Sequence, residues 1–352
     1  MLSTVKGGLF ATARRLGVMA GVARSGWRRQ RLLILCYHGV SLDDEHEWNG
    51  GLYVSPTVLR QRFEVLRRGG YSVLSLDEGI RRMYQGTLPS RAVALTFDDG
   101  TYDFYVRALP LLREFGFAAT VYVPTYYTRF QRPVFNTMLA YVAWKARDHS
   151  AIPAHGLADG PEPLAVSTAT ERARSVERVR NEAERLALTA EAKDARVRLF
   201  ADRLGVDYDA LLARRVLHLM TPDELRQAAA AGVDVQLHTH RHWMPEDRAL
   251  FRREIDDNRR ELHAVLGDQV VLRHFCYPSG EHRPAFLPWL EEAEVESATT
   301  CDPGLATSTT HPLQLPRFID TMGQSRDAFE AWASGFAELL PRRTRRGRHA
   351  GD

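Results

Sequence analysis

The chain has 352 residues, of which 44% are apolar and 26% charged, an ordinary globular composition with enough apolar residues for a sizeable core. Its three cysteines include no CxxC pair, so they imply no disulfide framework and favour a reducing compartment. The net charge of +3 hides two basic ends, because residues 1–42 hold seven Lys or Arg and no acid, and residues 342–352 hold five Arg and one Asp. The acidic remainder of the chain argues against nucleic acid as its ligand.

Residues 1–30 form a basic segment with the spacing of an amphipathic helix. Arg14, Arg15 and Arg24 interrupt its apolar patches, so no run reaches the length of a signal peptide or a transmembrane helix. Two alternatives are open: the segment lies on an anionic membrane surface, or it packs on the protein's own body. Without a cleavable signal peptide, we expect a cytoplasmic protein, peripheral on the inner face of the membrane under the first alternative. The residues expected on the apolar side are Leu9, Phe10, Ala13, Leu16 and Ala20.

Eight β-rich runs recur along the chain, with helix-like segments between them. Most are short, continuous apolar runs, as expected for strands buried on both faces of a parallel sheet. Helix starts such as Ser55-Pro56 and Thr221-Pro222 separate them. Seven or eight alternating strands and helices suit an α/β barrel over residues 31–335. The runs are 32–37, 71–76, 92–97, 118–123, 233–237, 270–277, 295–300 and 313–318.

One stretch, residues 125–215, interrupts the alternation of strands and helices because it contains no clear strand. Residues 150–168 are rich in Pro, Gly and Ala and are predicted as a loop, whereas residues 169–204 are rich in Ala, Arg and Glu and are predicted as helix. We therefore expect a mainly helical insertion between two barrel strands. Residues 336–352 are expected to be a basic C-terminal tail.

Two acidic residues, Asp98 and Asp99, directly follow the buried run 92–97 and precede Gly100. Acidic side chains at the carboxyl end of a parallel strand lie where barrel enzymes have their active sites. Neighbouring carboxylates repel each other, so both stay ionised most easily beside a cation. An ordinary Asp-Asp-Gly turn is the alternative for this motif taken alone.

A pair of histidines, His238 and His242, follows the buried run 233–237. Four residues apart on one helical turn, they would face the same side, as in two-histidine zinc sites, while His240 would point away. Together with one of the two Asp residues they make three ligands with open positions, which suits catalytic Zn²⁺, Co²⁺, Mn²⁺ or Fe²⁺. The second Asp is then free to act as a base.

Residues 275–280, Phe-Cys-Tyr-Pro-Ser-Gly, end a third strand at the same expected edge of the barrel. Their backbone N–H groups would be able to face a developing oxyanion, although a plain loop is the alternative. Aromatic residues just beyond strand ends, among them Trp48 and Tyr102, would be able to stack on a sugar ring or simply pack.

These motifs resemble the polysaccharide deacetylase family, the NodB-like carbohydrate esterases. Residues 96–100 (Thr-Phe-Asp-Asp-Gly) resemble its first motif, 238–242 (His-Thr-His-Arg-His) its histidine motif, and 277–280 its proline-containing motif. Residues 35–40 resemble the first strand of many members. The resemblance runs from about residue 31 to 320, outside the insertion.

The resemblance implies a distorted (β/α) barrel of seven or eight strands, of the glycoside hydrolase/deacetylase type, and a metal-dependent hydrolase. It assigns Asp99, His238 and His242 to a divalent metal, with Zn²⁺ the first choice, and makes Asp98 the general base. The N–H near Ser279 would stabilise the oxyanion, and Tyr277 and Pro278 would lie against the substrate. The implied reaction removes an N-acyl group, most simply acetyl, from an amino sugar of a polysaccharide or a lipid-linked glycan.

The chain departs from the family's pattern at the proton donor. The family often has a late motif with a histidine that protonates the leaving amine, whereas residues 313–318 carry Arg317 and no histidine. His311 and His38 are two candidates for the acid. Arg317 would orient Asp98, bind substrate or form a buried structural ion pair. Alternative functions are a deformylase of a formamido sugar and a carbohydrate-binding relative with weak catalysis.

Overall fold

The computed structural model describes residues 2–341, with side chains from Gly7 onward. Its main sheet is built from eight short strands, all of which are paired in parallel. A separate pair of two-residue strands, β2 (Gly39–Val40) and β3 (Tyr53–Val54), lies beside it. The strands of the main sheet are β1 (Leu33–Tyr37), β4 (Ser72–Leu74), β5 (Ala92–Phe97), β6 (Thr120–Val123), β7 (Asp234–Leu237), β8 (His274–Cys276), β9 (Ser297–Thr299) and β10 (Phe318–Ile319).

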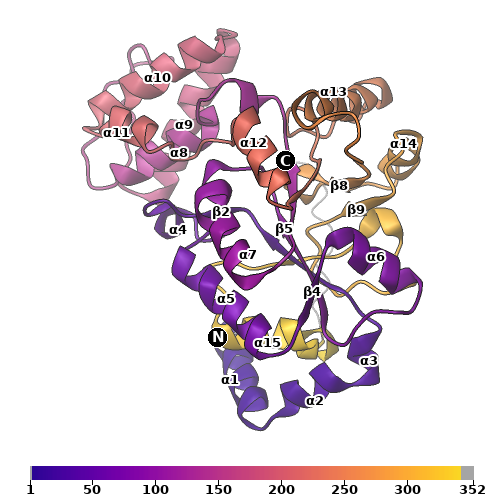
Figure 1. The fold of residues 1–352 in the computed structure, drawn as a ribbon. Coiled ribbons are helices and arrows are strands. Elements are labelled where there is room, and N and C mark those ends of the chain that lie inside the picture. Colours follow the sequence, from indigo (N-terminus) through magenta and orange to yellow (C-terminus); the bar gives the residue numbers. More distant parts are fainter. Residues whose placement is uncertain (1, 342–352) are drawn as a thin grey trace.

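The sheet curls into an incomplete barrel. Its order is β10-β1-β5-β6-β7-β8-β9, and β4 pairs with the lower half of β5. Strand β1 lies between β5 and β10, with Leu35 opposite both Leu95 and Phe318. The two edges of the sheet approach each other through one bridge, between Thr299 of β9 and Leu315 of the segment that precedes β10. The predicted α/β barrel is therefore confirmed (Figure 1).

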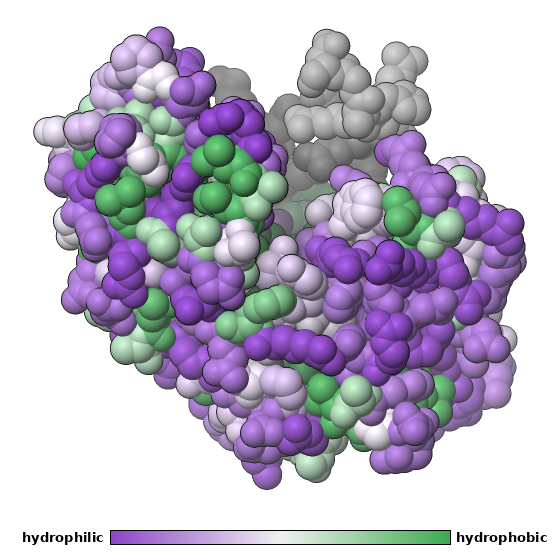
Figure 2. Space-filling view, turned by 90° about the horizontal axis from the view of Figure 1, so that it is seen from above, coloured by the Kyte–Doolittle hydropathy of each residue, from purple (hydrophilic) through white to green (hydrophobic). Residues whose placement is uncertain are grey.

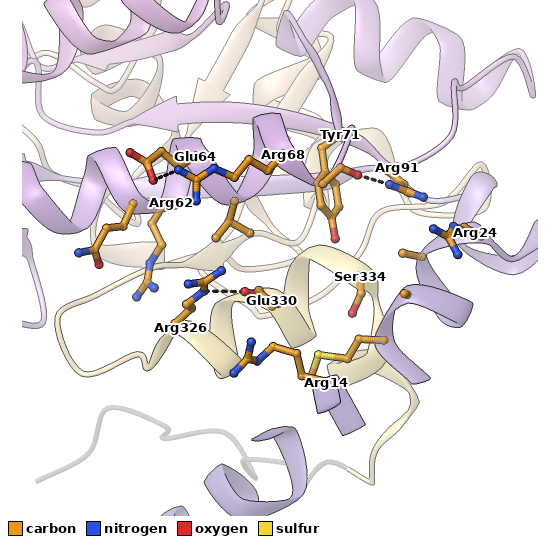
Figure 3. Close-up of a pocket in the computed structure, with 16 residues that line it drawn as sticks. Arg14, Arg24, Arg62, Glu64, Arg68, Tyr71, Arg91, Arg326, Glu330 and Ser334 are labelled. Carbon is orange, nitrogen blue, oxygen red and sulfur yellow. Dashed lines mark hydrogen bonds and ion pairs between the residues drawn. The ribbon is translucent and has the colours of Figure 1, made fainter. Parts of the chain in front are cut away.

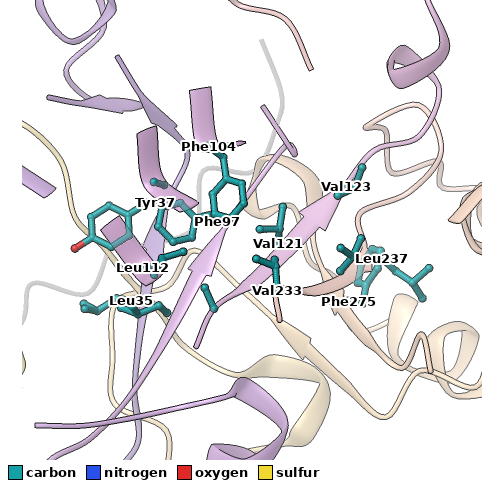
Figure 4. Close-up of a cluster of buried hydrophobic side chains, with 14 of the residues drawn as sticks. Leu35, Tyr37, Phe97, Phe104, Leu112, Val121, Val123, Val233, Leu237 and Phe275 are labelled. Atoms are coloured by element: carbon teal, nitrogen blue, oxygen red, sulfur yellow. The ribbon is translucent and has the colours of Figure 1, made fainter. Parts of the chain in front are cut away.

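Helices cover the outer face of the sheet, where alternate strand residues form the main core (Figure 4). Leu35, Phe97, Val121 and Phe275 belong to this core, and the opposite residues of the strands fill the interior of the barrel. Five residues of π-helix, Phe104–Ala108, precede α7. The helices of the barrel are α4 (Glu45–Trp48), α5 (Pro56–Arg68), α6 (Leu76–Tyr84), α7 (Leu109–Phe115), α12 (Pro222–Ala230), α13 (Arg248–Leu266), α14 (Phe286–Glu292) and α15 (Arg326–Ser334).

The segment between β6 and α12 forms a lobe of four helices, α8 (Phe135–Lys145), α9 (Ala169–Arg185), α10 (Ala190–Arg203) and α11 (Tyr208–Ala213). These helices enclose a hydrophobic core of their own, distinct from the barrel core. The lobe stands beside the upper end of the barrel (Figure 1), and from above that side shows groups of hydrophobic residues among hydrophilic ones (Figure 2).

The N-terminal segment forms α1 (Leu2–Arg15), α2 (Val18–Arg24) and α3 (Gly26–Arg29), which pack on α15 at the lower end of the barrel. The prediction of one apolar side was wrong, because Gly17 adopts a left-handed conformation and separates α1 from α2. Phe10 and Ala13 are buried on the protein's own body, whereas Leu16 is 74% exposed. Leu9 and Ala20 are exposed as well.

Two further sequence predictions concern the C-terminal part. The strand expected over residues 313–318 is wrong for most of its length: Pro312–Gln314 forms a 3₁₀ turn, and only β10 pairs with β1. Of the basic tail, residues 342–352 lie outside the described residues. Within residues 2–341, none of the helices is long and apolar enough to cross a membrane.

Candidate active site

The candidate site lies at the edge of the sheet where the strands end. Asp98 and Asp99 directly follow β5, and His238 directly follows β7. Parallel strands end at the same edge, so these side chains from distant parts of the sequence meet there. The helical lobe leaves the barrel at this edge too, after β6.

A sharp turn after β5 separates the two neighbouring carboxylates. Asp99 has a φ of 70° and Gly100 a φ of 60°, both in the left-handed region. A Cβ on Gly100 would lie 3.0 Å from the Val123 side chain, so the turn requires glycine there. The turn leaves Asp98 only 3% exposed inside the barrel. The Asp99 side chain is 31% exposed and turns toward the two histidines.

The three sequence-predicted metal ligands converge on one point. Asp99 Oδ1 lies 3.3 Å from His238 Nε2 and 3.2 Å from His242 Nε2. This buried oxygen has no partner in hydrogen-bonding geometry among the described residues. His238 Nδ1 lies 2.8 Å from the Cys276 carbonyl, so it carries the proton and leaves the Nε2 lone pair free. This donor set fits a divalent cation bound by one carboxylate and two imidazoles.

Charge distribution in this set also favours a cation. Burial raises the pKa of Asp99, but the imidazoles of His238 and His242 outweigh burial and hold the pKa well below its ordinary value. Burial lowers the pKa of His242, whereas Asp99 raises it to a net value above the ordinary one. A metal at this point would bind a carboxylate that is already ionised.

The two histidines reach this point from a loop, so the predicted helical turn is wrong. Residues between β7 and α13 are not helical, and Thr239 and His242 have φ values of 57° and 56°. Helix α13 holds the loop: Asn258 Oδ1 accepts from the His238 N–H at 2.9 Å. His240 bonds through Nδ1 to Thr125 Oγ1 and lies outside the ligand set, as predicted.

Asp98 is held by Arg317, which is completely buried. The guanidinium donates to both carboxylate oxygens of Asp98, at 2.7 and 2.8 Å, and to the Thr300 carbonyl at 2.9 Å. Burial raises the pKa of Asp98, but Arg317 outweighs burial and holds the pKa well below its ordinary value. Arg317 therefore forms the predicted buried ion pair, in a position from which it can orient Asp98.

All three cysteines surround this ion pair, a feature that the sequence analysis missed. Cys276 Sγ and Cys36 Sγ lie 3.4 and 3.6 Å from Asp98 Oδ2, and Cys301 Sγ lies 3.7 Å from Arg317 Nη2. Burial raises the pKa of each thiol above its ordinary value, so the thiols remain neutral beside the carboxylate. Strand alternation would have placed Cys36 and Cys276 on the interior face, next to Asp98.

The two histidines considered as proton donors lie at opposite ends of the sheet. His38 follows β1, with Nε2 3.7 Å from Asp98 Oδ2, and its buried Nδ1 has no hydrogen-bond partner among the described residues. His311 is exposed and caps the 3₁₀ turn at Pro312. The neighbouring Thr310 carbonyl accepts from Tyr84, at the lower end of α6, so the prediction of His311 as acid is wrong.

In the third motif, Ser279 is exposed, whereas the preceding residues Tyr277 and Pro278 are buried. Ser279 has a φ of 57°, and its N–H has no backbone partner among the described residues. Tyr277 and Pro278 are buried, and the Tyr277 hydroxyl donates to the Leu313 carbonyl at 2.9 Å. The prediction that Tyr277 and Pro278 contact substrate is therefore wrong, because both residues are buried.

The predicted sugar-stacking residues are engaged in other contacts. Trp48 packs against Tyr141, with ring centroids 5.3 Å apart, and contributes to the core of the helical lobe. The Tyr102 ring is covered by the Arg215 guanidinium, 3.8 Å from the ring centroid. Packing therefore engages part of each ring, and both residues remain partly exposed.

Known proteins share the sequence motifs of this site. A model of the polysaccharide deacetylase family matches residues 85–298. The chain is 35% identical over 100 residues to the poly-beta-1,6-N-acetyl-D-glucosamine N-deacetylase of Escherichia coli (strain K12), a match that covers 28% of this chain and 14% of that one. It is 32% identical over 94 residues to YxkH of Bacillus subtilis (strain 168), covering 26% and 32% of the two chains.

Solved structures share the fold. The deacetylase PplD of Streptococcus pyogenes, in complex with acetate, gives a TM-score of 0.56 at 19% identity, over 88% of this chain and 99% of that one. A polysaccharide deacetylase from Bacillus cereus gives a TM-score of 0.53 at 15% identity, over 86% and 69%. The family match spans more than half of the chain and includes Asp98, Asp99, His238 and His242. The chain belongs to the polysaccharide deacetylase family.

Proposed function

We propose that this protein removes an N-acyl group from an amino sugar of a polysaccharide, with Zn²⁺ as the bound metal. Acetyl is the first choice for the acyl group. The observation that carries the proposal is the convergence of Asp99, His238 and His242 beside the buried Asp98–Arg317 pair. One carboxylate and two imidazoles are a donor set typical of catalytic zinc. The Escherichia coli relative named for N-deacetylation of poly-beta-1,6-N-acetyl-D-glucosamine supports this class of substrate.

A bound metal would supply a Lewis acid that polarises the acyl carbonyl and makes the attacking water more acidic. Asp98 accepts the proton of that water, because Arg317 keeps its carboxylate ionised and fixed in orientation. The low pKa of Asp98 means that it holds the proton only briefly. The Ser279 N–H donates to the carbonyl oxygen as negative charge develops there.

His38 is the proton donor in this proposal. Its Nε2 lies 3.7 Å from Asp98 Oδ2, and its side chain is 17% exposed, so the ring reaches both the buried carboxylate and the open edge of the site. A protonated imidazole can protonate the leaving amine as the C–N bond breaks. The position of His311 at the other end of the sheet leaves this role to His38.

The experiment is acetate release from β-1,6-linked N-acetylglucosamine oligomers with added Zn²⁺, and formate release from the N-formyl analogues. We expect Asp98→Asn to abolish release and His38→Gln to lower kcat about 100-fold. Asp268→Asn, on the exposed surface after α13, is the matched control. Equal acetate release by wild type and Asp98→Asn would refute the proposal that the protein is a hydrolase using Asp98. Release of formate without acetate would show that the reaction is deformylation and not deacetylation.

We also propose that the N-terminal helices attach the protein to the cytoplasmic face of an anionic membrane. Leu9 of α1, Leu16 in the turn between the two helices and Val18 of α2 are exposed. A cavity of about 380 Å³ beside them is lined by several arginines, including Arg24 and Arg91 (Figure 3). Exposed apolar residues beside basic ones suit an anionic lipid surface. In this arrangement the catalytic edge faces away from the lipid (Figure 1).

Vesicle sedimentation tests this attachment. We expect binding to phosphatidylglycerol vesicles and not to phosphatidylcholine vesicles, with binding lost in Leu16→Asp. Leu186→Asp, a similarly exposed leucine on the helical lobe, should bind like wild type. Equal binding by wild type and Leu16→Asp would refute the proposed surface.

A further inference from the structure

A second cavity lies where the chain leaves β6 and enters the helical lobe. Its volume is about 400 Å³, within the range of cavities that hold small ligands. Residues 126–136 form one wall, and the corner between α9 and α10 forms the other. Its aromatic lining residues are Tyr126, Tyr127, Phe130, Phe135 and Tyr208.

This aromatic cavity is directly connected to the loop that carries the metal ligands. The Tyr126 N–H donates to the His240 carbonyl at 2.8 Å, and the Tyr126 ring lies 5.6 Å from the His240 ring. His240 is the middle residue of the segment from His238 to His242. The wall of the cavity and the ligand loop therefore hold each other in place.

The aromatic rings of this wall are partly open to solvent. Tyr126 contacts Tyr127 and Phe130, each with ring centroids 5.1 Å apart, and Phe130 is 41% exposed. An aromatic face offers an apolar surface on which the C–H face of a sugar ring can lie. Asn136 and Thr189 line the same cavity and can bond sugar hydroxyls.

The charges of the aromatic cavity are balanced, unlike those of the arginine-lined cavity near α1 and α2. Arg132 pairs with Asp194, which also accepts from the Tyr208 hydroxyl at 2.8 Å. The remaining charged lining residues are one base, Lys193, and one acid, Glu184. A balanced, aromatic and hydroxyl-bonding lining suits an uncharged sugar better than a phosphate or another anion.

We infer that the aromatic cavity is a glycan subsite, which binds an N-acyl amino-sugar unit of the polymer at a distance from the unit being deacylated. The inference rests on the proposed function, since it names where that same substrate continues. It makes the helical lobe a determinant of chain-length preference: a long oligomer contacts both the metal site and the cavity, whereas a monosaccharide contacts only the metal site.

The experiment compares a β-1,6-linked N-acetylglucosamine hexamer with the methyl glycoside of the monosaccharide, in the zinc-loaded full chain. For Phe130→Ala and Tyr127→Ala, we expect the ratio of the two kcat/KM values to fall about tenfold, through a higher KM for the hexamer. Leu186→Ala, an exposed residue of the same lobe outside the cavity, is the matched control and should keep the wild-type ratio.

Binding separates failure of the subsite from failure of the proposed function. In the Asp98→Asn background, calorimetric affinity for the hexamer should fall about tenfold on adding Phe130→Ala and stay constant on adding Leu186→Ala. An unchanged kinetic ratio together with unchanged hexamer affinity would overturn the subsite. If the wild type releases no acetate, the proposed reaction fails, and the affinities alone decide whether the cavity binds the glycan.

Discussion

The two ends of the sheet each contain a fully buried arginine, and the two residues differ in what they bind. Arg317, near the catalytic edge, forms two bonds with the carboxylate of Asp98. Arg28, at the opposite end, donates only to backbone carbonyls, those of Arg31, Ala92 and Ala333. One arginine therefore sets the state of a reactive group, whereas the other joins three chain segments.

The pKa values of the two arginines follow from these partners. Burial lowers the pKa of Arg28 to about 10, because carbonyl dipoles compensate only part of the lost hydration. Burial also lowers the pKa of Arg317, but Asp98 outweighs burial and raises it well above its ordinary value. Burial alone does not distinguish a functional arginine from a structural one; the charge of the partner does.

The largest expected effect breaks the catalytic pair. Arg317→Lys cannot reproduce two parallel bonds to a carboxylate, so Asp98 loses its fixed orientation. We expect kcat for acetate release to fall by about 100-fold or more, with KM within about twofold of wild type. Steady-state kinetics measure this loss, and a variant with wild-type kcat would show that Asp98 does not need its arginine.

The second prediction breaks the structural arginine. Arg28→Met leaves three buried carbonyl oxygens without their donor, which should lower the free energy of unfolding by about 3 kcal/mol. Because Arg28 is remote from the catalytic edge, kcat of the folded variant should stay within about twofold of wild type. Denaturant unfolding and kinetics measure both effects. A fall in kcat as large as that of Arg317→Lys would contradict the division between the two ends.

The third prediction extends the comparison to a buried carboxyl without an arginine. Asp103 accepts from the Val40 N–H and the Thr101 hydroxyl, and burial raises its pKa to about 7. A carboxyl whose pKa is raised in the folded state contributes stability that is fully present at pH values below its pKa in the unfolded chain. This stability is lost as the pH rises toward 7.

Asp103→Asn removes this titration and keeps an oxygen acceptor for both donors. Relative to the variant, wild type should lose up to about 1.4 kcal/mol of unfolding free energy per pH unit between about pH 4 and 7. Urea unfolding of both proteins across this range measures the difference. Parallel stability curves would show that Asp103 does not bind a proton more tightly in the folded protein.

The strands and the ligand residues were predictable because their signals are local. Continuous apolar runs identify buried strands, and Asp98, Asp99 and His238 follow two of those runs directly. The loop that carries His242 was not predictable, since it has left-handed residues and bonds to the distant residue Asn258 of α13. Arg28 looked like one more basic residue of the N-terminal segment, because only tertiary contacts show its burial.

The metal content of the purified protein tests the central claim most directly. Elemental analysis should find one divalent metal per wild-type chain and almost none in His238→Ala. His240→Ala is the matched control, because His240 lies in the same loop but bonds to Thr125 instead of facing Asp99. This variant should keep its metal. Equal metal in wild type and His238→Ala would contradict the assignment of Asp99, His238 and His242 as the metal site.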